Sequence, residues 1–335
     1  MTGFELYLKR NSKSFDRYLA TFFTDGTHPD MKRYLYGPLA EFSDNAGKRH
    51  RPLICLLACE AVGGDKELAR SAAAAVEHFH TAALIHDDIE DSSLTRRGEP
   101  CLHIREGEGL AINAGDLALS LVTGAVVHDP QLDDATKLKV LAELVDMTTR
   151  TIEGQALDIG WARDDRFDLT VEDYLLMASH KTAFYSGAVP LAIGAIIGEG
   201  TPQQVGVLRG FGMAAGLAFQ VQDDVLNLVG TRESTKKDFR SDITEGKRTL
   251  VAVHALHHSP QRDRLLEILS ARETDSGVLA EAVSIMEAAG SIEYANDYAC
   301  DLVVSAKRSL DDELPDSKAK ALLLSMADFF IKRSS

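Results

Sequence analysis

The run from Glu67 to Asp91 contains neither glycine nor proline, and it is apolar almost all round until its acidic end. Apolar residues on every side are typical of a helix buried in a protein core. We therefore expect this run to form the central helix of the fold. Only nine prolines punctuate the whole chain, and the stretches between them are rich in Ala, Leu and Glu, which favour helices over strands. The sequence predicts an all-α protein.

Five further segments show the same helical pattern, and the loops between them carry Asp, Gly, Pro and Arg. They are residues 133–159, 170–189, 201–229, 275–289 and 292–314. A chain of 335 residues with 45% apolar side chains can bury one large core. No repeat, low-complexity tract or linker interrupts it. We predict a single all-α domain over residues 1–335, a bundle of about ten or more helices.

The net charge of −15 argues against a nucleic-acid binder that uses its whole surface. Cys55, Cys59, Cys101 and Cys300 form no CxxC pair and have no histidine at zinc-finger spacing, so we expect reduced thiols and a cytoplasmic protein. The most apolar run, residues 185–198, contains Gly and Pro and is shorter than the about 20 residues that cross a bilayer. No transmembrane segment is expected.

Three carboxylates, Asp87, Asp88 and Asp91, stand at the end of the predicted central helix. A spacing of four places Asp87 and Asp91 on one helix face. The negative end of the helix dipole lies there, and the carboxylates also repel one another, so a cation is expected beside them. Taken alone, the cluster is equally well explained by a solvated acidic helix end.

A second cluster, Asp223, Asp224 and Asn227, repeats this spacing in FQVQDDVLN after another apolar helix. Neither cluster contains His or Cys, and oxygen ligands suit Mg²⁺, whose shell is completed by waters and substrate phosphates. The two clusters together predict a magnesium diphosphate held between two facing helices. In so acidic a chain, two such clusters can also coincide by chance.

The basic residues also come in short loops, beside the ends of predicted helices. They are Lys48, Arg49 and Arg51 in GKRHRP, Arg96 and Arg97 in RRGEP, Lys236 and Lys237, and Lys247 and Arg248 in EGKRTL. Each of these groups, taken alone, is typical of a solvated surface. Acids and bases that alternate along the chain predict a site for two diphosphates, one bound through Mg²⁺ and one bound directly.

Six segments resemble, in order, the motifs of trans-isoprenyl diphosphate synthases: AGKRHRP, HTAALIHDDIEDSSLTRRGEPCLH, GQALD, HKT, FQVQDDVLN and TEGKRTL. The resemblance covers about residues 46–250 and is greatest to geranylgeranyl diphosphate synthases. It implies an isoprenoid synthase fold with a central cavity, a homodimer, and head-to-tail condensation of isopentenyl diphosphate with an allylic diphosphate. The C20 geranylgeranyl product is expected, with farnesyl or longer-chain products as the alternative.

The resemblance also implies a role for each charged residue that matches a motif. Three Mg²⁺ ions would be bound, two by Asp87 and Asp91 and one by Asp223, with Asp88 and Asp224 in support. A second motif that ends in Asn227 lacks one carboxylate of the usual pattern. Isopentenyl diphosphate would be held by Lys48, Arg51, His80 and Arg97.

The allylic diphosphate would be contacted by Arg96, and its site would be lined by Lys181, Thr182, Gln220, Lys237 and Lys247; Lys236 is the alternative to its neighbour Lys237. Loss of diphosphate leaves an allylic cation, so Mg²⁺ and basic residues must stabilise the departing charge while water is excluded. The uncharged oxygens of Thr182 and Gln220 can stabilise that cation by their dipoles. The residues alone favour structural roles, with His80 as a hydrogen-bonded core histidine and Gln220 as a cap of internal backbone groups; the full ordered set of motifs favours the roles in the site.

Product length is expected to depend on the helix that carries Asp87, because the allylic tail should run back along it. Ala82 and Ala83 are small and leave room for the tail in the first turn, and Phe79 is the next bulky residue on that side. One helical turn of about 5.4 Å is close to one isoprene unit. We expect a cavity for a C20 product with Phe79 in its floor; another helix or a dimer partner could also supply the floor.

Two other functions fit parts of the pattern. A class I terpene cyclase shares the acidic Mg²⁺ site but binds no second diphosphate, and Lys48, Arg51 and Arg97 argue against it. A non-catalytic partner subunit of a synthase would be expected to lack part of an acidic motif, and this chain has both motifs.

Overall fold

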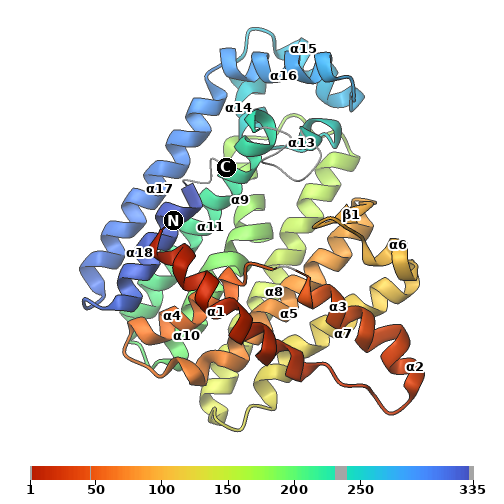
Figure 1. Ribbon diagram of the computed structural model, residues 1–335. Helices are drawn as coiled ribbons and strands as arrows, with labels where there is room; N and C mark the ends of the chain where they lie inside the picture. Colours follow the sequence, from red (N-terminus) through yellow and green to blue (C-terminus); the bar gives the residue numbers. More distant parts are fainter. Residues whose placement is uncertain (1, 46, 231–239, 332–335) are drawn as a thin grey trace. The chain divides into compact units, whose positions relative to one another are not determined.

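The computed structural model describes residues 2–45, 47–230 and 240–331 (Figure 1). Contacts between Cα atoms divide the chain into two compact units, each assembled from three stretches. Unit 1 comprises Met1–Thr148, Val189–Leu208 and Glu313–Ser325, and unit 2 comprises Thr149–Ala188, Arg209–Asp312 and Met326–Ser335. The single domain expected from the sequence stays a prediction.

Unit 1 contains most helices of the N-terminal half and one short hairpin. Its helices are α1 (Gly3–Leu19), η1 (Ala20–Phe22), α2 (Pro29–Met31), η2 (Lys32–Tyr36), α3 (Gly37–Asp44), α4 (His50–Ala61), η3 (Lys66–Ala69), α5 (Arg70–Glu90), α6 (Leu102–Glu106), α7 (Glu108–Val127) and α10 (Val189–Ile197). The hairpin strands are β1 (Thr95–Arg96) and β2 (Glu99–Pro100), paired antiparallel.

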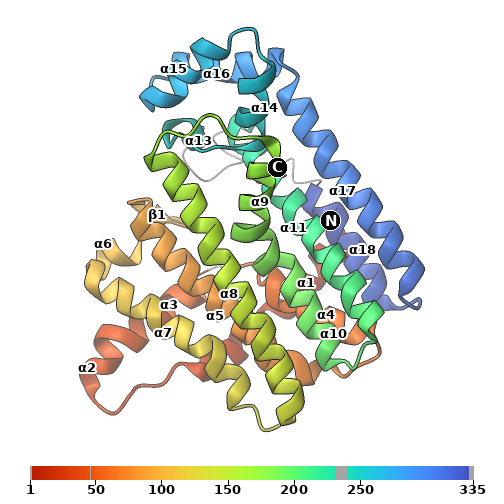
Figure 2. The ribbon, with the colours of Figure 1, turned by 180° about the vertical axis from the view of Figure 1, so that it is seen from behind.

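Unit 2 contains α9 (Val171–Ala178), η4 (Ser179–Ala188), α13 (Ser241–Thr244), α14 (Leu250–His258), α15 (Arg262–Ala271) and α16 (Ser276–Ala288). Four longer helices contribute to both units: α8 (Asp134–Arg163), α11 (Pro202–Val229), α17 (Ser291–Glu313) and α18 (Lys318–Ile331). Figure 2 shows α9 beside α14, with which it packs. The described residues therefore form more than ten helices and almost no strand, which confirms the all-α prediction.

Helix α5 is the central helix of unit 1, as its composition predicted. It packs against α7, α4 and α10 (Figure 1). Alanines 72–75 are fully buried, and their small side chains let neighbouring helices approach closely. A core cluster of Leu39, Ala82, Ile85, Leu102, Ala111, Ala114 and Ala118 joins α5 to α7 and α3. Packing on several sides holds the acidic end of α5 in place.

The hairpin that follows α5 turns through Arg97 and Gly98, whose φ angles are +55° and +85°. Two successive positive φ angles are typical of a type I′ turn, which matches the twist of a two-residue hairpin. The register pairs Arg96 with Glu99. This turn brings the RRGEP arginines back toward the end of α5.

Helix η4 of unit 2 has π-helical geometry, and its backbone packs directly on its neighbours. A Cβ atom on Gly154 of α8 would lie 2.2 Å from the backbone nitrogen of Lys181, and one on Gly187 would lie 2.1 Å from the carbonyl oxygen of Gly212. Only glycine fits at these two contacts. π-Helical segments are often found at functional sites and are mostly single turns, whereas η4 extends over ten residues.

The six segments predicted from the sequence each contain a helix, and most ends agree within a few residues. These segments leave out several helices of the described residues, among them the apolar helices α4, α7 and α14. Helix α7 is long and apolar enough to cross a membrane by length and composition, and 39% of its most apolar window is buried. Core helices of soluble proteins can be equally long and apolar, and α7 packs on α5.

Candidate active site

An arginine of the hairpin holds the acidic end of α5. The Nε of Arg96 donates to Oδ1 of Asp88 at 2.6 Å, and its Nη2 donates to Oδ2 of Asp87 at 3.3 Å. Asp91 is the C-cap of α5, and its N–H donates to the carbonyl of Asp87 at 2.9 Å. The last turn of α5 contains no basic residue. Arg96 is therefore the cation that the repelling carboxylates were expected to need.

Asp88 is fully buried, and burial raises the pKa of its carboxyl above the ordinary value even though Arg96 opposes the shift. Its Oδ2 is buried and accepts no hydrogen bond from a nitrogen or oxygen of the described residues, and besides Arg96 the Cys101 thiol, a weak donor, acts on this carboxyl. The oxygen-only donors of this cluster fit a hard cation such as Mg²⁺. Within the described ranges, no three His, Cys, Asp or Glu side chains converge, so waters and substrate would have to complete its shell.

Two of the residues expected to hold isopentenyl diphosphate lie together in unit 1. Nη1 of Arg51, near the start of α4, lies 3.2 Å from Nε2 of His80 on α5. Burial, and secondly the charge of Arg51, hold the pKa of His80 well below its usual value. The imidazole is therefore neutral and accepts a hydrogen bond from Arg51. Lys48 is exposed in the loop that leads into α4.

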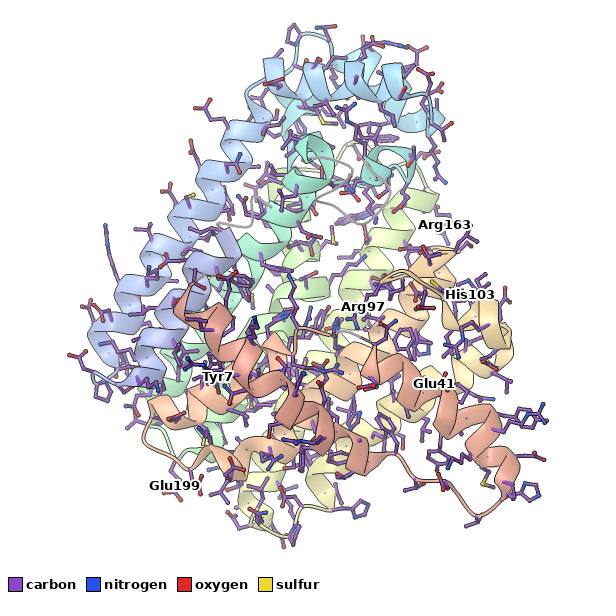
Figure 3. The ribbon with its side chains drawn as sticks, viewed as in Figure 1. Tyr7, Glu41, Arg97, His103, Arg163 and Glu199 are labelled. Carbon is purple, nitrogen blue, oxygen red and sulfur yellow. The ribbon has the colours of Figure 1, made fainter. Side chains whose placement is uncertain are left out.

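Arg97 contacts the same loop from the hairpin turn. Its Nη1 donates to the carbonyl oxygen of Asn45, and burial lowers the pKa of its guanidinium. Beside it is a cavity of about 30 Å³ lined by Asn45, Arg96, Arg97, Arg105 and Glu41, among others. Figure 3 labels Arg97 of the hairpin turn and Glu41 of α3. The cavity has room for about one or two waters and none for a diphosphate.

A chain of hydrogen bonds joins four side chains in unit 2. Thr182 Oγ1 donates to Gln220 Oε1 at 2.8 Å, and Gln220 Nε2 donates to Asp224 Oδ1 at 2.7 Å. Tyr174, which sequence reasoning missed, donates to the other oxygen of Asp224 at 2.7 Å. Burial, and then the charge of Asp242, raise the pKa of Asp224 to about 8. Both oxygens of Asp224 are engaged, so this carboxylate suits a supporting role beside exposed Asp223.

The two described lysines of the expected allylic site both pair with acids. Lys181 forms an ion pair with Asp158 of the GQALD motif. The same α8 helix packs on the backbone of Lys181 at Gly154. Lys247 lies 2.6 Å from Glu245 and 3.6 Å from Asp242. Lys236 and Lys237 lie outside the described residues.

Asn227, at the last position of the second acidic motif, is used within the protein. Its Oδ1 accepts a hydrogen bond from the backbone N–H of Asp242 at 3.2 Å, and its Nδ2 donates to Ser241 Oγ at 3.2 Å. The asparagine thus ties α11 to the start of α13. An aspartate there would keep the acceptor but lose the donor.

Phe79, Ala83 and Asp87 lie four residues apart and share one face of α5. Phe79 is 3% exposed, and Ala83 is partly exposed. Ala82 is fully buried in the core cluster against α7. Of the two alanines expected to border the allylic tail, only Ala83 lies on the face of Asp87.

The profile of the polyprenyl synthetase family matches residues 32–286. The chain belongs to this family. It is a trans-prenyltransferase, as the motifs predicted, and the terpene cyclase and non-catalytic alternatives are disfavoured. A short chain isoprenyl diphosphate synthase of Methanothermobacter thermautotrophicus is 44% identical over 289 residues, covering 86% of each chain. A geranylgeranyl diphosphate synthase of Saccharolobus solfataricus is 33% identical over 293 residues, again covering 86% of each.

Solved structures of the family have the same fold. Geranylgeranyl pyrophosphate synthetase from Pyrococcus horikoshii superposes with a TM-score of 0.91 at 32% identity, covering 98% of both chains. A geranylgeranyl pyrophosphate synthase from Corynebacterium glutamicum, complexed with isoprenyl diphosphate and magnesium, has a TM-score of 0.86 at 30% identity and covers 99% of both chains. The isoprenoid synthase fold expected from the motifs is confirmed.

Proposed function

We propose that the chain condenses isopentenyl diphosphate head-to-tail with allylic diphosphates and releases C20 geranylgeranyl diphosphate. The observation that carries this proposal is the arrangement on α5. Its last turn bears the carboxylates paired with Arg96, and His80, seven residues earlier, accepts from Arg51. Helix α5 thus carries an acidic group suited to a metal diphosphate and a neutral histidine that orients Arg51 of α4, a basic group suited to a second diphosphate. The relatives named geranylgeranyl and short chain synthases support the C20 product.

Isopentenyl diphosphate is assigned to Lys48, Arg51, His80 and Arg97. Neutral His80 orients the guanidinium of Arg51 without adding a repelling charge, because its low pKa keeps the ring unprotonated. An oriented guanidinium can bind phosphate oxygens through two parallel hydrogen bonds. Held in this way, the homoallylic substrate keeps its diphosphate while its alkene reacts.

The allylic diphosphate is assigned to Arg96, Lys181, Lys247 and, beyond the described residues, Lys237. Asp87 and Asp91 would hold two Mg²⁺ ions and Asp223 a third, with Asp88 and Asp224 as supporting carboxylates. When bound, Mg²⁺ stabilises the charge of a departing diphosphate. Thr182 donates to Gln220, so its own lone pairs stay available to face a developing allylic cation.

Incubation of the purified protein with labelled isopentenyl diphosphate and dimethylallyl, geranyl or farnesyl diphosphate tests this proposal. We expect magnesium-dependent elongation that ends at C20 and that a chelator abolishes. No elongation of any primer at saturating Mg²⁺ would overturn the proposal.

The homodimer is proposed from an exposed stripe on α8. Leu138, Val145, Ile152 and Ile159 are 68%, 58%, 59% and 42% exposed, and their spacing of seven places them along one side of the helix. Large apolar side chains exposed along one side of a helix are typical of an interaction surface, and a second copy of the chain fits the homodimer that the motifs imply. The cytoplasm is the proposed compartment, because Cys55, Cys59 and Cys101 are buried free thiols.

Light scattering tests the dimer. The double substitution Val145→Lys/Ile152→Lys should halve the molar mass, whereas Val304→Lys, at a 46% exposed position of α17, should leave it unchanged. A double variant that keeps the parent mass would show that α8 is not the dimer surface.

A further inference from the structure

The tripeptide Gly-Lys-Arg occurs in two of the basic loops, as Gly47-Lys48-Arg49 before α4 and as Gly246-Lys247-Arg248 before α14. In each loop the lysine is the residue assigned to a diphosphate. The arginine that follows is buried in both cases, at 4% exposure for Arg49 and 3% for Arg248. Lys48 is exposed and Lys247 partly exposed. In each loop, the lysine side chain is thus accessible to solvent, whereas the side chain of the arginine that follows it is buried.

Arg49 ties three elements of unit 1 together. Its Nε donates to Asp16 of α1 at 2.6 Å, and its Nη1 donates to Glu77 of α5 at 2.6 Å. Its Nη2 donates to the carbonyl oxygen of Ser43 in α3. Arg49 also has a φ of +54°, a region that costs a non-glycine residue free energy and persists only where the surroundings enforce it. The guanidinium contacts enforce it here.

Arg248 is held in unit 2 mainly by backbone carbonyls. Its Nε donates to the carbonyl oxygen of Arg166 at 2.9 Å, and its Nη1 donates to that of Gly246. The guanidinium lies over the ring of Phe167, 4.1 Å from the centroid, and Nη2 is 3.8 Å from Asp165. Burial lowers the pKa of this guanidinium. The segment 165–167 therefore holds the loop that carries Lys247.

The glycine of each tripeptide lies against the guanidinium of its own arginine. A Cβ atom on Gly47 would lie 2.7 Å from Nη1 of Arg49, and one on Gly246 would lie 3.4 Å from Nη1 of Arg248. Gly246 also has a φ of +65°, which favours glycine. In both loops, the backbone before the lysine and the side chain after it pack together, so the backbone of the lysine is fixed from both sides.

We propose that Arg49 and Arg248 are positioning residues, each of which fixes the backbone of one lysine so that its ammonium group is presented to one diphosphate. Arg49 acts through Lys48 on isopentenyl diphosphate, and Arg248 acts through Lys247 on the allylic diphosphate. This assignment of substrates rests on the proposed function. A lysine on a fixed backbone loses less conformational entropy on binding than one on a mobile loop. Each arginine should therefore affect one Michaelis constant and leave the other unchanged.

The test for Arg49 must separate positioning from charge compensation, because its loss leaves the carboxylate of Glu77 buried and unpaired. Arg49→Lys keeps the charge but loses the fork of donors. The pair Arg49→Met/Glu77→Gln removes both buried charges. We expect both variants to melt near the parent temperature and to raise the KM for isopentenyl diphosphate about tenfold, with kcat and the allylic KM unchanged.

Arg248→Met and Arg248→Lys provide the reciprocal test. We expect the allylic KM to rise about tenfold and the KM for isopentenyl diphosphate to stay the same. Leu265→Ala, in the core of α15 at 0% exposure, is the control for general destabilisation. It should lower the melting temperature and change neither KM.

Folded Arg49 and Arg248 variants with parental KM values would overturn the proposal, and so would variants that shift both constants together. A parent protein that elongates no primer would instead overturn the proposed function. In that event, calorimetric titration with inorganic diphosphate tests whether Arg49 and Arg248 position a diphosphate-binding lysine. Weaker binding to either arginine variant than to Leu265→Ala would support this positioning role, and equal binding would overturn it.

Discussion

Acidification should destabilise the protein through His78 on α5. The side chain is 1% exposed, and its ring meets Phe22 and Phe23 edge-on, with centroids 5.0 and 5.7 Å away. Its Nε2 is buried without a hydrogen-bond partner. Burial, and secondly the charge of Arg49, lower the pKa of His78 from 6.5 to about 4. The folded protein therefore keeps this imidazole neutral where an unfolded chain would protonate it.

The sign of the effect follows from the proton balance. Above the unfolded pKa of 6.5 both states are neutral, and the stability that depends on neutral His78 is fully present. As the pH falls toward the folded pKa of about 4, the unfolded state binds the proton first and stability is lost. Between pH 7.5 and pH 5.0, these two pKa values correspond to a loss of about 2 kcal/mol from this residue.

Urea unfolding followed by circular dichroism at pH 7.5 and pH 5.0 measures this loss. His78→Leu removes the titrating group and fills the same apolar space, so its free energy of unfolding should fall about 2 kcal/mol less than that of the parent. Other buried histidines, such as His80, are present in both proteins, so their contributions cancel in the difference between the two. His258→Leu, at an exposed position, should behave as the parent does. Equal losses in the parent and in His78→Leu would refute this reasoning.

Three further predictions concern the site. Asp87→Ala should lower kcat by several orders of magnitude at saturating Mg²⁺. The melting temperature should stay nearly unchanged, because Arg96 keeps its shorter ion pair, the one with Asp88. Parental activity would contradict the metal assignment. Ala83→Phe should shorten the main product toward C15 in chromatography of the hydrolysed products, provided that circular dichroism shows a folded protein. Arg51→Ala should mainly raise the KM for isopentenyl diphosphate and Lys247→Ala the allylic KM, each by the equivalent of about 2–5 kcal/mol; a shift in the same constant would contradict the two-site assignment.

Long apolar runs made four of the five longest described helices predictable, namely α5, α8, α11 and α17. The run from Glu67 to Asp91 became η3 and α5, and the pattern over 201–229 became α11. The hairpin after α5 was missed because its turn requires a positive φ at Arg97, a conformation that an arginine does not signal. The π-helical geometry of η4 was missed too, because it depends on close contacts with α8 and α11 that lie far away in the sequence.

The residue types of the site were predictable from the motifs, and their partners were not. Lys181 pairs with Asp158, and Asp224 accepts from Tyr174, contacts that only the folded chain brings together. Glu77 did carry a signal, because a charged residue in the middle of an otherwise apolar helix needs a partner, but nothing in the sequence identifies that partner as Arg49.

The length of the final product shows whether the chain is a C20-forming synthase. Purified protein should be incubated with excess isopentenyl diphosphate, farnesyl diphosphate and Mg²⁺, and the hydrolysed alcohols identified by mass spectrometry. We expect geranylgeraniol, C20, as the main product, and its loss in Asp87→Ala. Farnesyl diphosphate recovered unextended, or extended mainly beyond C20, would contradict it.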